Sequence, residues 1–269
     1  MDYFIELLFS GLTRGAIYAL IALGYTMVYG IIGMINFAHG EIYMIGAFTA
    51  LIVATVLSLW GLPLFAVLAL AALAAAVWAA AYGCTIERLA YRPLRTAPRL
   101  SPLISAIGMS IFLQNWVALG QGARDMAVPA LLPGALRFGD EGGFEIFVPY
   151  TRVLIIAVTV VLMIALTLYI KHSRMGRASR ACSQDMHMAN LLGIDTNRVI
   201  SFTFILGAML AAVGGVLIAL AIGKLNPFIG FLVGIKAFTA AVLGGIGSIP
   251  GAMLGGILLG VAETFAAAY

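Results

Sequence analysis

Long apolar stretches without charged side chains dominate the chain. They cover residues 15–40, 42–86, 100–123, 153–170, 199–223 and 237–262. A helix needs about 20 apolar residues to cross about 30 Å of hydrocarbon, so the second stretch must hold two spans. Gly61-Leu62-Pro63 is the expected turn between them, because proline cannot continue a helix interior. The pattern therefore predicts about seven membrane-spanning helices.

Shorter segments complete this picture. Residues 225–235 are too short to cross a membrane and indicate a re-entrant or interfacial piece. At the N-terminus, Glu6 and Arg14 flank an apolar segment that has no small-residue cleavage site, so we do not interpret it as a removable signal peptide. We predict an all-α fold in which residues 1–269 form a single transmembrane domain, a bundle of about seven to eight helices with broken or re-entrant segments.

Composition agrees with a membrane protein that has several spans. Of the 269 residues, 63% are hydrophobic and 10% are charged, and the mean hydropathy is +1.08. Soluble domains carry about 25% charged residues. The formal net charge of +4 is then better explained by membrane topology than by nucleic-acid binding.

Two basic loops set the predicted orientation. Residues 87–99 and 171–198 carry nine of the 15 Lys and Arg residues, and two spans separate them, so they lie on one face. The positive-inside rule makes that face cytoplasmic. The loop at 124–152, with four acidic residues and three prolines, then lies outside, as does the N-terminus.

A polar island interrupts the first apolar stretches. Asn36, His39 and Glu41 form the only cluster of ionisable and amide side chains between residues 15 and 86. A carboxylate at the bilayer centre costs about 2.5–3.5 kcal/mol on insertion scales. The island is either a turn at the membrane surface or a functional break inside the membrane. Counting spans places it at the cytoplasmic edge, as a turn with His39-Gly40 at its tip.

A second break is predicted near the end of the chain. Gly244, Gly245, Gly247, Pro250 and Gly251 fall inside one apolar stretch and argue for an unwound segment, with Pro250 at the first position of the second half-helix. Gly247, Gly251 and Gly255 also form a row at helical spacing, and Gly256 and Gly260 continue it on a neighbouring face. The simpler interpretation of these small residues is close helix packing.

The loop at 171–198 has internal structure. Residues 178–192 predict one short helix, Gly193 is its expected stop, and Asp195 or Thr196 is the expected cap of the next span. Such a helix either lies on the membrane or docks a cytoplasmic partner.

Several functions are not supported by any motif. There is no phosphate-binding loop, and residues 230–237 are a near miss with the wrong spacing. We find no metal-ligand constellation, no ladder of buried carboxylates and no catalytic pair for an intramembrane enzyme. His172 and His187 are predicted to be solvated loop residues. Cys84 and Cys182, in or near cytoplasmic loops, are not expected to form a disulfide.

Three segments, residues 24–41, 105–115 and 237–252, carry a family resemblance. The first strongly resembles the signature of branched-chain amino acid ABC transporter permeases of the LivH type. The other two also match, although the third is shared with the sister LivM-type permease. The resemblance covers essentially the whole chain. Members of this family usually continue through another apolar segment to a short polar tail, whereas this sequence stops at Tyr269. Either the sequence is shortened or the last span is missing.

The resemblance implies a permease subunit of an importer for leucine, isoleucine and valine in the bacterial cytoplasmic (inner) membrane. Its implied partners are a paralogous LivM-type permease, two cytoplasmic ATPase subunits and a periplasmic branched-chain amino acid binding protein. The chain itself would bind no cofactor, since ATP and Mg belong to the ATPases. A permease for another small polar solute, such as urea, short amides, a sugar or other amino acids, is the alternative, and a stand-alone channel is a third.

The resemblance also suggests where coupling occurs. Its coupling helix falls in the loop at 171–198 by position, although the usual acidic-Ala-Ala opening is absent. The candidate coupling residues are Arg177, Arg180, Met188, Leu191, Leu192 and Gly193.

A zwitterionic substrate needs donors for its carboxylate and an acceptor for its ammonium group. The candidate pathway residues are Asn36, His39, Glu41, Gln114, Asn115 and Asn226. For Gln114 and Asn115 the competing interpretation is interhelical hydrogen bonding, and for Asn226-Pro227 it is a turn at the outer surface. For the polar island it is a structural role in orienting two packed helices. Our hypothesis is that ATP-driven movement of the coupling loop alternates access past the breaks at 36–41 and 244–251.

Overall fold

The computed structural model describes the whole chain except residues 1, 96, 99, 130–131, 133 and 139–145. Two parts of the predicted loops therefore lie outside the described residues. They are Arg99, in the basic loop at 87–99, and residues 139–145, in the loop at 124–152. The ten helices are α1 (Asp2–Ile32), α2 (His39–Leu59), α3 (Leu64–Ile86), α4 (Leu100–Gln121), α5 (Tyr150–His172), α6 (Arg174–Gln184), α7 (Met186–Leu191), α8 (Thr196–Ile222), α9 (Ile229–Leu243) and α10 (Ile249–Ala268).

Seven of the described helices are long and apolar enough to cross a membrane, which confirms the all-α prediction. α3 continues through a π-helical turn, η1 (Glu87–Tyr91), and a 3-10 turn, η2 (Arg92–Leu94), so this span reaches Leu94. The remaining elements are four short strands, β1 (Met126–Ala127), β2 (Ala135–Phe138), β3 (Ile146–Pro149) and β4 (Lys224–Leu225).

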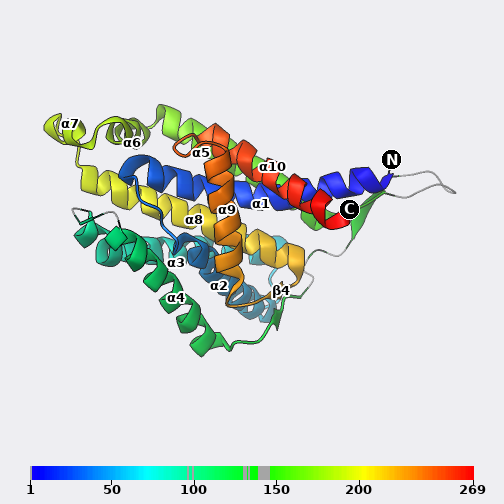
Figure 1. Cartoon of the computed structure of the whole chain (residues 1–269). Helices are drawn as coiled ribbons and strands as arrows, with labels where there is room; N and C mark the ends of the chain where they lie inside the picture. The colour runs from blue at the N-terminus through cyan, green and yellow to red at the C-terminus, as the bar shows by residue number, and fades with distance from the viewer. Residues whose placement is uncertain (1, 96, 99, 130–131, 133, 139–145) are drawn as a thin grey trace.

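The bundle has two distinct ends (Figure 1). One, which we call the basic end, carries η1, η2, α6 and α7. The other, the hairpin end, carries the N-terminus, the antiparallel β2–β3 hairpin and the antiparallel β1–β4 pair. This matches the prediction that both basic loops share one face and that the N-terminus lies on the other. That the basic end faces the cytoplasm remains a prediction.

Helix α1 and helix α8 form the centre of the bundle, whereas α4 is the least buried of the spans. Large apolar side chains of α4, such as Ile104, Phe112 and Leu119, are exposed. Because lipid tails are as apolar as these side chains, outward apolar faces are expected on a membrane-embedded bundle.

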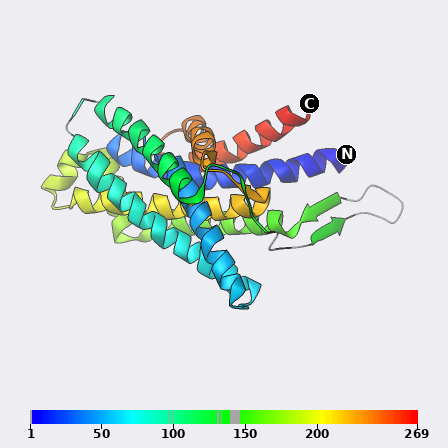
Figure 2. The ribbon, with the colours of Figure 1, turned by 90° about the horizontal axis from the view of Figure 1, so that it is seen from below.

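Helix α9 crosses the bundle instead of running alongside its neighbours (Figures 1 and 2). It begins at Ile229, ends at Leu243 and is too short to be counted as a span. The predicted bounds of the interfacial piece, 225–235, and of the following span, 237–262, are therefore both wrong. The charged Lys236 suggested a boundary near residue 236, but the chain breaks at residues 244–248, between α9 and α10.

The first span is also shifted from its predicted bounds of 15–40. Helix α1 begins at Asp2 and ends at Ile32, so Glu6 and Arg14 lie within it. Both side chains are partly accessible along the helix, and a charge there does not interrupt it. The turn at Gly61 between α2 and α3 is confirmed, with a backbone φ of +68° that suits glycine.

Small residues let α1 and α10 touch backbone to backbone. A Cβ on Gly15 would lie 2.7 Å from the Cα of Ile257, and one on Gly256 would lie 2.5 Å from the Cα of Ala19. The predicted role of these glycines in helix packing is confirmed. The predicted row beginning at Gly247 is wrong, because Gly247 lies in the turn before α10 with a φ of +93°.

Candidate functional site

The polar island lies inside the bundle. After α1 ends at Ile32 the chain turns back, and α2 begins at His39. Asn36 and His39 are each 2% exposed and Glu41 is fully buried. The partners of Glu41 and His39 lie near the midpoints of α4 and α8, which places the island at the middle of the bundle. The prediction of a surface turn with His39-Gly40 at its tip is therefore wrong, because the chain re-enters the bundle after Gly33 before α2 starts.

Glu41 is held by neutral donors. The Ser110 hydroxyl and the Gln114 amide both donate to its Oε1, at 2.9 and 2.8 Å. Both donors are on α4, one helical turn apart. On the other side, a Cβ on Gly230 would lie 2.5 Å from Oε2 of Glu41, so the backbone of α9 approaches the carboxylate closely. Glu41 thus joins α2, α4 and α9.

His39 fills a space that two glycines leave open. A Cβ on Gly24 of α1 would lie 2.5 Å from Cε1 of His39, and one on Gly207 of α8 would lie 3.5 Å from the same atom. The Tyr25 ring packs edge-on against the imidazole at 4.8 Å between centroids. A side chain at Gly24 would exclude the imidazole from this position, whereas a Cβ at Gly207 would be in ordinary contact with it.

Asn36 is tied to the end of α3. The Tyr91 hydroxyl donates to its Oδ1 at 2.9 Å. Several buried polar atoms on α1, on α2 and in the turn between them have no hydrogen-bond partner among the described residues: Thr26 Oγ1, Asn36 Nδ2, His39 Nε2, Glu41 Oε2 and Tyr43 Oη. Buried polar groups are normally paired, so free donors and acceptors of this kind are chemically able to receive a polar solute or water. We call this set of residues, with Gln114 and Ser110, the central junction.

Two predicted pathway residues lie elsewhere. Asn115 is exposed and donates to Ile111 O of its own helix, at 2.8 Å. Asn226 lies in the turn before α9 at the hairpin end, where it donates to Asp125 at 2.7 Å and accepts from the Phe228 backbone N–H. The structure therefore brings Gln114 to the central junction but not Asn115 or Asn226, since neighbouring positions on α4 point to different sides.

The predicted break near the end of the chain is present. Residues 244–248 form turns between α9 and α10, and Gly245 and Gly247 have φ values of +88° and +93°. Gly244 and Gly251 are in backbone contact. Pro250 occupies the second position of α10, not the first as predicted, because Ser248 caps the helix and Ile249 opens it. The break borders an open cavity of about 780 Å³ at the basic end, shared with the end of α1 and with α6.

The predicted single helix over 178–192 is wrong, because the segment forms two helices. Asp185 interrupts it in an extended conformation, and its carboxylate caps α7 by accepting from the Met188 backbone N–H at 2.9 Å. Gly193, with a φ of +82°, ends α7, as predicted. Asp195 caps α8, one of the two residues proposed for this position.

The candidate coupling residues divide into two groups. Arg180 donates to the backbone carbonyls of Ile170 and Lys171, and Arg177 donates to that of His172, so both arginines cap the end of α5. By contrast Met188, Leu191 and Leu192 are 52%, 68% and 75% exposed at the tip of the basic end. Only the second group offers free apolar surface.

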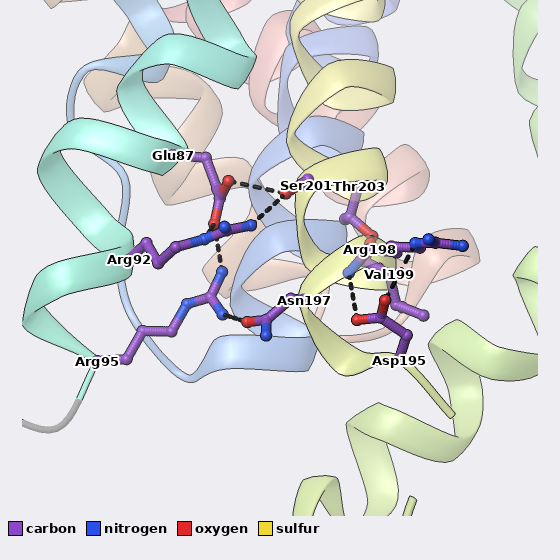
Figure 3. Close-up of polar contacts among 9 residues, drawn as sticks. All are labelled: Glu87, Arg92, Arg95, Asp195, Asn197, Arg198, Val199, Ser201 and Thr203. Carbon is purple, nitrogen blue, oxygen red and sulfur yellow. Dashed lines mark hydrogen bonds and ion pairs between the residues drawn. The ribbon is translucent and has the colours of Figure 1, made fainter. Parts of the chain in front are cut away.

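A buried ionic cluster at the basic end was missed by sequence reasoning (Figure 3). Glu87 on η1 is fully buried and pairs with both Arg92 and Arg95. The Ser201 hydroxyl donates to its Oε2 at 2.8 Å, and Arg95 also donates to Asn197 at 2.6 Å. Burial lowers the pKa of the Arg95 guanidinium, and the Glu87 carboxylate acts in the opposite direction. The cluster fastens the end of α3 to the start of α8.

The sequence held one signal for this cluster. Glu87 is the only acidic residue in the first basic loop, and arginines follow it at positions +5 and +8. The positive-inside rule counts only Lys and Arg, so it uses Arg92 and Arg95 as markers of topology and does not consider them as ion-pair partners of Glu87.

Other chemistry is not evident in the part of the chain that the structure describes. No group of three or more His, Cys, Asp or Glu side chains is arranged to hold a metal ion there. Cys84 and Cys182 are free thiols, and burial raises the pKa of the Cys182 thiol, which disfavours the reactive thiolate.

Seven described helices that are long and apolar enough to cross a membrane, packed around a buried polar junction, are typical of a multi-pass membrane protein. The sequence model of the family described as branched-chain amino acid transport system / permease component matches residues 7–269. The chain belongs to this family, which is a family of transport subunits and not of enzymes.

Named relatives cover nearly the whole chain. The high-affinity branched-chain amino acid transport system permease protein BraD of Pseudomonas aeruginosa is 59% identical over 98% of this chain and 87% of its own length. The corresponding permease protein LivH of Escherichia coli K12 is 55% identical over 99% of this chain and 87% of its own length. Permease protein LivM of the same organism is 28% identical over 93% of this chain and 61% of its own length.

Proposed function

We propose that this chain is the membrane-spanning permease subunit of an ATP-binding cassette importer that carries leucine, isoleucine and valine across the bacterial cytoplasmic membrane. The observation that carries the proposal is the identity of 55–59% to permeases named for branched-chain amino acid transport, over almost the whole chain. The polar central junction inside the bundle is consistent with a path for a polar solute.

The proposed assembly contains three kinds of partner subunit. They are a paralogous LivM-type permease, two cytoplasmic ATPase subunits that use ATP and Mg, and a periplasmic binding protein that supplies selectivity. The lower similarity to LivM supports a second, related permease in the same system. The bilayer surrounds the apolar faces of α4 and α5.

Within the bundle, Asn36, His39, Glu41 and Gln114 are our candidates for the transport pathway. Their support is that Asn36, His39 and Glu41 each carry a buried polar atom without a described partner, and that Gln114 donates to Glu41. A periplasmic protein that provides selectivity would leave the permease needing only weak, transient contacts.

We propose that the ATPases dock on α7. Met188 and Leu191 of α7 and the following Leu192 have exposed apolar side chains. Helix α7 itself lies at the tip of the basic end (Figure 1). A few well-packed residues near the centre of an interface supply most of its binding free energy. Arg177 and Arg180 instead hold α6 on α5, so we expect them to act on coupling only through the position of α6 and α7.

The function is tested by purifying the tagged chain from its native membrane, identifying the copurifying subunits and reconstituting the complex in liposomes. We expect two ATPases, a LivM-type permease and ATP-dependent uptake of labelled leucine. Unlabelled isoleucine and valine should compete with it, whereas urea and acetamide should not. Uptake without ATP would indicate a channel, and competition by urea or acetamide alone would indicate another solute.

The docking surface is tested in the same complex with the double variant Leu191→Ser/Leu192→Ser. Loss of two exposed apolar side chains from an interface centre costs about 2–4 kcal/mol of binding, so the ATPases should be lost during purification. Leu119→Ser, an equally exposed leucine near the hairpin end, is the matched control. Full ATPase retention in the double variant would contradict docking on α7.

A further inference from the structure

A second cavity lies away from the central junction, in the half of the bundle nearer the hairpin end. Its volume is about 430 Å³, within the range of roughly 300–1,000 Å³ that small-molecule sites occupy. Six elements supply its wall: α1, the end of β3, the start of α5, the end of α8, α9 and α10. None of the predicted pathway residues lines it.

The cavity contains an ionic cluster formed by side chains of the spans α1 and α10 and of the shorter helix α9. Glu263 of α10 accepts from Lys236 of α9 at 2.7 Å and from the Tyr18 hydroxyl of α1 at 2.9 Å. Arg14 of α1 lies 3.8 Å from the same carboxylate. Ionisable side chains inside membrane helices are costly, and they typically mark substrate or ion pathways.

Two guanidinium groups in this cavity have N–H donors that the described residues do not fully pair. Arg14 reaches Glu263 only at the limit of an ion pair, and its side chain is 47% exposed. Arg152, at the start of α5, has a buried Nη1 with no hydrogen-bond partner among the described residues. Guanidinium groups bind carboxylates in a bidentate manner. This wall would therefore bind a group with two anionic oxygens, such as a carboxylate.

The rest of the wall is apolar. Ile17, Ile218, Ile222 and Val233 line the same space as the charged groups. The cavity therefore offers cations for a carboxylate, one carboxylate for an ammonium group and a branched aliphatic surface. These are the three chemical features of an apolar α-amino acid.

We propose that this cavity is a transient binding site for the transported amino acid before it reaches the central junction. Arg152 and Arg14 hold the α-carboxylate, Glu263 accepts from the α-ammonium group, and Ile17, Ile218 and Val233 contact the side chain. Lys236 and Tyr18 position Glu263 by donating to it. This inference rests on the proposed transport function, and it adds residues from α1, α5 and α10 to the pathway.

The site is tested by protection from thiol labelling in the reconstituted complex. Cys84 and Cys182 are replaced by alanine, and Ser10, which lines the cavity, is replaced by cysteine. We expect L-leucine to slow modification of the new thiol by a charged methanethiosulfonate, and leucinamide, which lacks the carboxylate, to leave the rate unchanged. Equal protection by both compounds, or by neither, would overturn the site.

Variants at Arg152 make the test specific. Arg152→Gln should raise the leucine concentration needed for protection by at least about tenfold, because a hydrogen bond to a charged group is lost. Arg152→Lys should bring the leucine concentration needed for protection part of the way back to the wild-type value. Arg124→Gln, an exposed arginine at the same end outside the cavity, should leave protection unchanged. Elution on size exclusion as the wild-type complex confirms that each variant is assembled.

Leucine uptake separates this inference from the proposed function. If the wild-type complex imports leucine while Arg152→Gln retains normal protection and uptake, the cavity site is wrong and the transport function stands. If the wild-type complex imports no leucine, the transport function is wrong. Protection that depends on anionic lipid and not on leucine would identify the occupant as a lipid headgroup and would also overturn the proposal.

Discussion

Glu41 and Glu87 are both completely buried, yet their surroundings differ in charge. Glu87, at the basic end, is paired with the guanidinium groups of Arg92 and Arg95. Glu41, at the centre, receives hydrogen bonds only from the neutral groups of Ser110 and Gln114, and its second oxygen has no described partner. The same side chain therefore serves two different purposes in one bundle.

The difference shows which buried carboxylate is structural. A buried ion pair leaves an uncompensated charge when one partner is removed, so Glu87 is essential to the cluster around it. Replacing Glu41 leaves no charged partner behind. Glu41 is buried in the bundle without a cation paired to it among the described residues. Ionisable side chains inside membrane helices typically mark substrate or ion pathways, which agrees with the role proposed for Glu41.

The largest expected effect follows from Glu87→Gln. Arg95, whose side chain is only 16% exposed, would lose its charged partner, and breaking a buried pair costs about 3–5 kcal/mol. We expect a large drop in the melting temperature of the detergent-solubilised protein, measured by fluorescence-detected size exclusion after heating. Asp195→Asn is the matched control. It removes the exposed pair with Arg198 but keeps a residue able to cap α8, so its effect should stay below about 1 kcal/mol. Equal melting temperatures for both variants would contradict a structural role of Glu87.

An intermediate effect is expected for Gly230→Ala, which tests the approach of α9 to Glu41. The new Cβ would lie 2.5 Å from Oε2 of Glu41 and 2.6 Å from the carbonyl oxygen of Gly40, and the latter is backbone that cannot turn away. Overpacking of this kind costs about 1–3 kcal/mol. Gly108→Ala on α4 has no atom within 4 Å of its new Cβ and should be neutral or slightly stabilising in the same melting assay. A neutral Gly230→Ala would show that α9 is not in close contact with α2.

The smallest effect on stability is expected for Glu41→Gln. The amide oxygen can still accept from Ser110 and Gln114, so the change in the free energy of unfolding should stay within about 1 kcal/mol. Leucine uptake by the reconstituted complex should nevertheless fall. Unchanged uptake in Glu41→Gln and in a separate His39→Ala variant would instead favour a purely structural role of the central junction.

The sequence was sufficient to predict the helical class and the number of spans, because charge-free length is a direct consequence of bilayer thickness. It also predicted the break at 244–251, since glycine and proline act locally. The bounds of α1 and α9 were wrong for a common reason. Arg14 and Lys236 were interpreted as span limits, whereas tertiary pairing with Glu263 allows both inside the bundle.

The depth of the polar island could not be predicted from local signals. Its burial depends on contacts with Gly24, Ser110, Gly207 and Gly230, which lie on four other helices. The same limitation explains why Gln114 and its neighbour Asn115 were treated alike. Their separation depends on how α4 is rotated toward α2, and the apolar pattern of α4 does not define that rotation.

The attachment of α6 to α5 has a mechanical consequence. Arg180 and Arg177 bind the last carbonyls of α5, and Gly176 lets α6 lie directly on Ile170. Helix α5 is an uninterrupted rod of 23 residues, about 35 Å long, with Arg152 near its other end. A tilt imposed on the α6–α7 pair would thus swing α5 as a rigid lever and displace the Arg152 guanidinium. Movement of the α6–α7 pair at the basic end and release of a carboxylate from Arg152 near the hairpin end would then be coupled through α5.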